Sequence, residues 1–217
     1  MINFKDCTLA QLDKTFDLRQ TRNSSILDDW LEQETEVSEL ERKVLLMLQE
    51  NAKLHIHDWN ETELSQHFIG PLFALVNFSS QRFALFAERP FGGTVAGIEM
   101  SGRPDGIIAS GFREPEKPYF CFQEYKKEKD PDGDPAGQAL AAMLVAQEIN
   151  EHQHPVYGCY VIGRTWFFMA LTEKIYGISD GHIITRDDIF DVFRILKLLK
   201  QMIAQFIIGD DNASKKR

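Results

Sequence analysis

Residues 119–126 read YFCFQEYK, an alternation of aromatic and polar side chains that predicts a β-strand. Successive side chains of a strand point to opposite faces, so Phe120, Phe122, Glu124 and Lys126 are expected to share one face. The acid and the lysine are therefore neighbours on the sheet surface. The two phenylalanines on the same face indicate that this surface is partly covered.

The segments on either side predict a mixed sheet with helices on its faces, which places the chain in the α/β class. Helices are expected to begin near residues 58–61, 136 and 185, and turns are expected at residues 101–104 and 129–137. The expected strands are residues 83–87, 95–100, 105–109, 119–126, 156–162 and 165–171.

The first 58 residues predict helices that pack on this core. Thr8 with Gln11, and Ser38 with Glu41, form capping-box patterns in front of apolar residues at helical spacing. Gly209 is expected to end the last helix. The expected organisation is a helical extension over residues 1–58, a core over residues 59–181, a C-terminal helix over residues 182–209 and a polar tail over residues 210–217.

Asp105 opens the strand that precedes residues 119–126. If the two strands pair as a hairpin through residues 110–118, Asp105 approaches Glu124, and Lys126 lies beside them. Two carboxylates and the backbone carbonyl between them can bind Mg²⁺, a cation that takes oxygen ligands. A lysine beside them can orient or deprotonate a water and offset charge on a phosphate. These residue types suit attack of a water on a phosphate with the help of a metal ion.

Two further polar residues lie on neighbouring helices. Glu61 falls near the middle of the apolar stripe of its helix, whereas Glu63 points to the opposite side. An acid on a buried face is unusual, so Glu61 is expected to supply a supporting or second-metal carboxylate. Gln138 lies in the first turn of the following helix, where it can hydrogen-bond substrate or water.

Pro104-Asp105 and, nineteen residues after Asp105, Glu124-Tyr125-Lys126 resemble the motif of the PD-(D/E)xK nuclease superfamily. The resemblance covers residues 59–172 in an α-β-β-β-α-β order. Residues 60–72 also look like the first core helix of the nuclease domain of type I restriction motor subunits.

The resemblance implies a restriction-endonuclease-like core and a role for each site residue. It implies that Asp105 and Glu124 bind Mg²⁺, for which Mn²⁺ can substitute, and that Lys126 positions the nucleophilic water. It implies that Glu61 and Gln138 support the site. The expected activity is that of a Mg²⁺-dependent endonuclease acting on nucleic acid, with DNA as the first candidate.

Each of these residues also has an ordinary structural explanation. Glu124 and Lys126 can form an ion pair on a solvated strand face, and Asp105 can be a turn residue. Glu61 can be a first-turn acid favoured by the helix dipole, and Gln138 can satisfy backbone groups at a helix start. The alternative function is therefore a catalytically silent protein that keeps the nuclease fold and acts as a binding or scaffold module.

Composition limits the other classes of protein. The 217 residues are 43% hydrophobic and 26% charged, which favours a folded globule over a disordered chain or a membrane bundle. There is no signal-peptide pattern at residues 1–6 and no C-x-x-C pair among the three cysteines, so a cytoplasmic protein with no membrane partner is expected. Many nucleases use two active sites to cut two strands, which leaves a homodimer open.

The net charge is 24 − 33 = −9, which taken alone argues against nonspecific coating of nucleic acid. Residues 28–41 contain seven acids and no Lys or Arg, so most of the excess lies there. Residues 113–129 carry five Lys or Arg against four Glu. The acidic segment 28–41 is therefore expected to face away from the nucleic acid, to regulate access, or to bind a basic partner.

Overall fold

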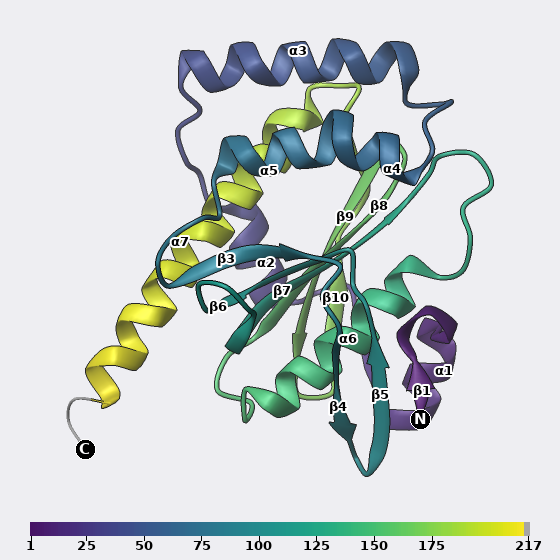
Figure 1. Ribbon diagram of the computed structural model, residues 1–217, viewed down its shortest axis with the longest axis vertical. Helices are drawn as coiled ribbons and strands as arrows, with labels where there is room; N and C mark the ends of the chain where they lie inside the picture. The colour runs from purple at the N-terminus through teal and green to yellow at the C-terminus, as the bar shows by residue number, and fades with distance from the viewer. Residues whose placement is uncertain (215–217) are drawn as a thin grey trace.

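An eight-stranded mixed sheet crosses the centre of the computed structural model, which describes residues 1–214 and confirms the α/β class (Figure 1). The strand order is β2-β10-β9-β8-β7-β6-β3, and β11 pairs with β9. β7 runs parallel to β8, and β2 runs parallel to β10. The strands are β2 (Arg19–Thr21), β3 (Phe83–Ala87), β6 (Gly106–Ser110), β7 (Glu116–Lys126), β8 (Val156–Ile162), β9 (Thr165–Thr172), β10 (Ile175–Ile178) and β11 (His182–Ile183).

A smaller three-stranded sheet has the order β1 (Ile2–Asn3), β5 (Ile98–Gly102) and β4 (Phe91–Val95). The β4–β5 hairpin turns at Ala96 and Gly97, whose φ angles are 47° and 81°. The strand expected over residues 95–100 is therefore wrong, because a turn divides it. Gly92 and Gly93, which look like a break in the sequence, lie inside β4.

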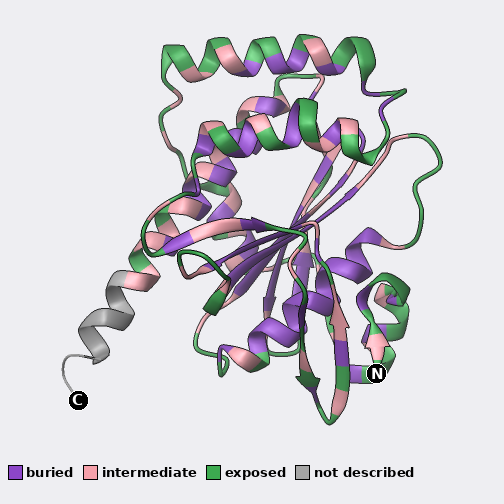
Figure 2. Cartoon of the chain, viewed as in Figure 1, coloured by how far each residue is buried: buried purple, intermediate pink, exposed green. Residues whose placement is uncertain are grey.

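Helices cover both faces of the large sheet and enclose two hydrophobic cores (Figure 1). One face carries α1 (Leu9–Phe16) and α6 (Pro135–Ile149). The other face carries α2 (Ser25–Glu32), α3 (Glu39–His55), α4 (Glu61–Leu64), α5 (Gly70–Val76) and α7 (Asp188–Ser214). Figure 2 shows that α6 is buried along most of its length, because the sheet covers one side and the β4–β5 hairpin and the N-terminal segment cover the other.

The capping signals place several helix starts. The Ser38 side chain accepts from the Glu41 backbone N–H and the Glu41 side chain accepts in return, so the box expected at α3 is confirmed. Thr8 accepts from the Gln11 N–H at the start of α1. Asn60 caps α4, which continues through a π-helical turn, η2 (Ser65–Ile69), into α5. The single helix expected here is thus wound in three parts.

The N-terminal 58 residues contain strands as well as helices. β1 pairs in parallel with β5 of the small sheet, and β2 pairs in parallel with β10 at the edge of the large sheet. The purely helical extension expected over residues 1–58 is therefore incomplete, because these short segments extend both sheets. A 3₁₀ turn, η1 (Phe4–Asp6), links β1 to the rest of the segment.

The last helix is longer than expected. α7 begins at Asp188 and continues past Gly209 to Ser214, so the expected stop at Gly209 is wrong. A single glycine costs a helix only about 1 kcal/mol relative to alanine, too little to end it by itself. Most of the expected polar tail is thus helical, and residues 215–217 of that tail lie outside the described residues.

A β-bulge in β7 changes the expected distribution of its side chains. Ile108 pairs with Cys121 and Ala109 pairs with Tyr119, so Phe120 is an extra residue in the ladder. Phe120 consequently packs into the core that contains Cys121, whereas Phe122 packs into the α6 core. The expected common face of Phe120 and Phe122 is wrong, because strict alternation fails at a bulge.

The acidic segment meets basic side chains of its own chain. Lys197 of α7 forms an ion pair with Glu41 at 3.0 Å and donates to the Glu36 carbonyl at 2.7 Å. Arg194 donates to the Gln33 carbonyl. These contacts lie before and at the start of α3, a helix about 25 Å long, and Glu61 follows the other end of that helix in the sequence.

Among residues 1–214, no helix combines the length and the apolar character needed to cross a bilayer. Cys7, Cys121 and Cys159 are buried free thiols.

Candidate active site

The β6–β7 hairpin brings Asp105 to the end of β7. Gly106 pairs with Gln123, which places the preceding Asp105 beside the next residues of β7. Asp105 Oδ2 accepts a hydrogen bond from the Tyr125 backbone N–H at 2.6 Å. A Cβ at position 106 would lie 2.1 Å from Gln123 Oε1, so a larger residue there would displace the buried Gln123 amide. The hairpin expected through residues 110–118 is confirmed.

Lys126 links β7 to α4 through its ammonium group. Its Nζ donates to Glu124 Oε1 at 2.9 Å and lies 3.9 Å from Glu61 Oε1. The side chains of Lys126 and Glu124 are 13% and 11% exposed, whereas that of Glu61 is 48% exposed. Glu61 lies in the first turn of α4, so the start of that helix is held beside the end of β7. Glu61 contacts the site from its rim. The buried position expected for Glu61 from its place on the apolar stripe is therefore wrong.

Burial makes the two carboxylates of this cluster unusually weak acids. Desolvation and the nearby charges of Glu61 and Glu88 raise the pKa of Asp105 to about 6, although the Tyr125 N–H and Lys126 oppose the rise. Desolvation and the charge of Asp105 raise the pKa of Glu124 to about 7 against the opposing effect of Lys126. A bound cation would offset the repulsion between the two carboxylates and so favour the ionised form of both acids.

Lys126 responds to the opposite balance of effects. Burial alone lowers the pKa of its ammonium group, but the hydrogen bond and the charge of Glu124 outweigh burial, so the pKa is raised. The charges of Glu61 and Asp105 act in the same direction. Lys126 is therefore a cation at neutral pH.

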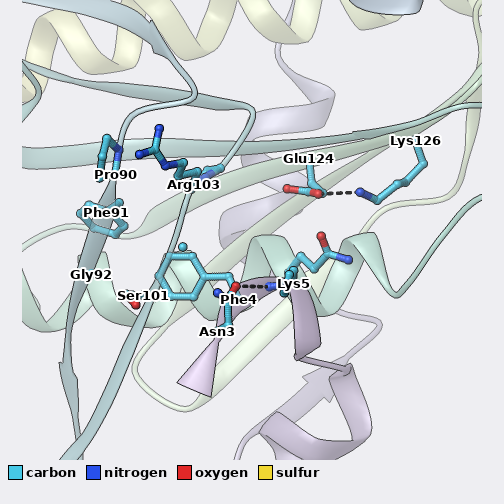
Figure 3. A pocket seen from close by; sticks show the side chains of 13 residues that line it. Asn3, Phe4, Lys5, Pro90, Phe91, Gly92, Ser101, Arg103, Glu124 and Lys126 are labelled. Atoms are coloured by element: carbon cyan, nitrogen blue, oxygen red, sulfur yellow. Dashed lines mark hydrogen bonds and ion pairs between the residues drawn. The ribbon is translucent and has the colours of Figure 1, made fainter. Parts of the chain in front are cut away.

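A cavity of about 730 Å³ opens beside Glu124 and Lys126 (Figure 3). Glu124 and Lys126 face each other on one side, and Pro90, Phe91 and Arg103 lie on the other (Figure 3). The wall is completed by Asn3, Phe4, Lys5, Gly92, Ser101, Gly102, Pro104 and Gln138.

Gln138 reaches this cavity because α6 starts close to the N-terminal segment. Asp134 caps α6 by accepting from the Gly137 N–H at 3.0 Å, and its other oxygen accepts from the Leu9 N–H at 2.9 Å. A Cβ on Gly137 would lie 2.6 Å from Thr8 Cα, so glycine is needed for the approach. Gln138 is 7% exposed, and among the described residues its side chain makes no hydrogen bond to the other four predicted site residues.

Sequence reasoning missed the two further cations of the cavity, Lys5 and Arg103. Both are exposed and line the wall opposite or beside the acids, and neither forms an ion pair within the described residues. Arg103 could have been found from its place directly before Pro104-Asp105. Lys5 carries no sequence signal, because a β1–β5 pairing brings it there.

The donor set agrees with Mg²⁺ in type. Among the side chains that the structure describes, residues 1–207, no group of three or more His, Cys, Asp or Glu is placed to hold a metal ion. Mg²⁺ in proteins is usually bound by one or two carboxylates, with water and substrate phosphates completing its shell. Asp105 and Glu124, with their raised pKa values, fit that smaller requirement.

The chain matches no protein-family model, and a search of curated proteins finds no similar sequence.

Proposed function

We propose that this chain is a Mg²⁺-dependent nuclease of the PD-(D/E)xK type that hydrolyses phosphodiester bonds of nucleic acid in the cytoplasm. The observation that supports the proposal most directly is the placement of Asp105, Glu124 and Lys126 at one end of the β6–β7 hairpin, close enough for their charges to affect one another. Glu124 and Lys126 also line the cavity, whereas Asp105 is not among its lining residues.

In this proposal Asp105 and Glu124 hold the cation. An ion held by these two carboxylates would supply positive charge beside the phosphate and would make water more acidic. Asp105 is held in place by the Tyr125 N–H, and Glu124 by Lys126. Both carboxylates are therefore oriented by groups of the hairpin that carries them.

Lys126 acts as a hydrogen-bond donor and a charge. Because its pKa is raised, its ammonium remains protonated at neutral pH and does not serve as the base. It can donate to the attacking water and offset charge on the phosphate. Glu61, 3.9 Å away and half exposed, can hold the Lys126 ammonium toward the rim of the site.

The cavity supplies groups that suit the rest of the substrate. Lys5 and Arg103 offer cations to neighbouring phosphates, and Arg can bind phosphate with two parallel hydrogen bonds. Gln138 offers amide donor and acceptor groups from a buried position. A local basic wall of this kind is compatible with a chain whose net charge is −9.

A second function is favoured by one specific contact. Lys126 already occupies one oxygen of Glu124 with a hydrogen bond of 2.9 Å, so the pair is satisfied without a metal. A nuclease-fold protein that keeps this ion pair for stability would act as a binding or scaffold module.

A cleavage assay separates these two functions. Supercoiled plasmid, single-stranded DNA and RNA would be incubated with the protein and Mg²⁺ or Mn²⁺. The cleavage rates of the Asp105→Ala and Lys126→Ala variants should each fall at least about 100-fold, because each substitution removes a charged group that contributes to stabilising the transition state. The matched control is Lys117→Ala, which removes an exposed lysine of the same strand.

Two results would contradict the nuclease proposal. Cleavage that survives both Asp105→Ala and Lys126→Ala would point to another site or a contaminant. A folded wild-type protein that cuts none of the nucleic acids with either metal would favour the binding module.

A further inference from the structure

α3 runs along the top of the molecule in the view of Figure 1. Its exposed side carries a stripe of apolar side chains. Leu40, Met47 and Leu54 are 71%, 62% and 74% exposed. They are seven residues apart, so on an α-helix they fall within about 20° of one line. Single exposed apolar residues are ordinary, but three in a row along one helix indicate a contact surface.

The opposite side of α3 is already in use. Leu45, Leu48, Gln49 and Ala52 are buried against the rest of the protein. α3 packs there on α7, α5 and η2. The outer stripe therefore has no role in holding α3 to its own chain.

One shoulder of the stripe carries complementary charges. Lys43 lies four residues before Met47 and Glu50 lies three residues after it, both exposed and both about 40–60° to the same side. Along the axis Lys43 is about 6 Å before Met47 and Glu50 is about 4.5 Å after it. Lys43 forms no ion pair with the side chains described, those of residues 1–207, whereas Glu50 contacts Lys53 at 2.7 Å.

This spacing is self-complementary under one particular symmetry. If a second α3 lies antiparallel with a two-fold axis at Met47, each Lys43 comes within about 1.5 Å along the axis of the other copy's Glu50. Leu40 then lies opposite Leu54, and Met47 lies opposite Met47. A parallel two-fold arrangement would put the two charged shoulders on opposite sides of the seam, with Lys43 and Glu50 of different copies about 10 Å apart along the axis, so neither contact could form.

We propose that the Leu40–Met47–Leu54 stripe of α3 is the interface of a two-fold homodimer in which two copies of the helix pair antiparallel. The apolar seam supplies most of the affinity, and the two Lys43–Glu50 contacts select the antiparallel register. The α3 interface lies on a different element from the candidate active site, and its test does not depend on nuclease activity.

Sedimentation and light scattering over a range of concentration test the interface. Wild-type protein should show a reversible monomer–dimer equilibrium below about 100 μM. Met47→Glu should weaken the dimer at least about tenfold, because it places two acids face to face at the centre of the seam. Phe112→Glu is the matched control, since it removes a 65% exposed apolar side chain elsewhere and should leave the dimer intact.

Charge reversal tests the antiparallel register itself. Lys43→Glu places Glu opposite Glu50, and Glu50→Lys places Lys opposite Lys43, so each variant alone should dimerise at least about fivefold more weakly. A mixture of the two variants should form a heterodimer, because both cross-interface contacts are then attractive. High salt should reduce this preference while the apolar seam persists.

The substituted side chains are all on the surface, so the circular dichroism spectrum and the melting temperature of each variant should match the wild type. The positions are Lys43, Met47, Glu50 and Phe112. A wild-type protein that stays monomeric up to about 100 μM would overturn the proposal. So would a dimer that is unchanged by Met47→Glu, which would have to use another surface. Failure of the mixed variants to associate would overturn the antiparallel register.

Discussion

Two ion pairs lie at opposite ends of the same strand and have different consequences. Near the start of β7, Lys117 contacts Glu151 at 3.1 Å, with both side chains roughly two-thirds exposed at 63% and 65%. Near its end, Lys126 contacts Glu124 at 2.9 Å, with side chains 13% and 11% exposed. The residue types and distances are nearly the same, but the second pair is shielded from water and lies beside the charges of Asp105 and Glu61.

The largest expected difference between the two ion pairs follows from removing each lysine in turn. Lys126→Met leaves Glu124 buried without its partner, and this should lower the free energy of unfolding by about 3 kcal/mol at pH 8. Lys117→Met should lower it by less than about 1 kcal/mol, because water replaces the lost contact. Urea denaturation of both variants measures the difference, and equal losses would show that burial does not set the strength of these pairs.

A smaller effect is expected in the pH dependence of the free energy of unfolding, to which the buried acids of the site contribute. Asp105 and Glu124 have pKa values raised to about 6 and about 7, so between roughly pH 4 and 7 the folded state binds more protons than the unfolded state. The contribution of these acids to stability is therefore most favourable at low pH, falls as the pH rises through this window, and is level above it.

Asp105→Asn should reduce that fall by on the order of 2 kcal/mol, because one of the two acids no longer ionises. The amide oxygen of Asn can still accept from the Tyr125 N–H, so the fold should persist. Denaturation at pH 4.5 and pH 8 measures the difference for the wild type and the variant. If their pH profiles coincide, Asp105 is not the strained acid that its burial implies.

The smallest expected effect belongs to another exposed pair. Arg89 contacts Glu114 at 3.2 Å, with side chains 43% and 68% exposed. Glu114→Gln should change the free energy of unfolding by less than about 0.5 kcal/mol, and the change should vanish in 1 M salt. A loss of 2 kcal/mol would show that exposure underestimates how far this pair is shielded from water.

Much of the central sheet could be predicted because its strands have local signals. β8 and β3 occupy the expected residues 156–162 and 83–87, and β9 extends the expected range by one residue, to Thr172. The Gly163-Arg164 turn and long apolar runs mark these boundaries in the sequence. The approach of Asp105 to Glu124 followed from the same kind of local pairing.

The missed features depend on contacts between distant parts of the chain. β1 and β2 have two and three residues, too few to show alternation, and they exist because β5 and β10 offer them partners. Strict alternation cannot reveal the bulge at Phe120. The sequence shows the acids and the lysine of the site but not how deeply they are buried, which the packing of other elements decides.

The pairing of β2 with β10 has a consequence for how the protein is made. Arg19 of β2 pairs with Ile175 of β10. At ribosomal rates β10 is synthesised roughly ten to thirty seconds after β2, so β2 has no partner during that time. Ile2 waits a shorter time for Met100 of β5. During that interval Phe4 and Phe16, both buried in the finished protein, have only part of their core. Nascent chains of this protein should therefore be most vulnerable to chaperone capture and proteolysis until residue 175 has emerged.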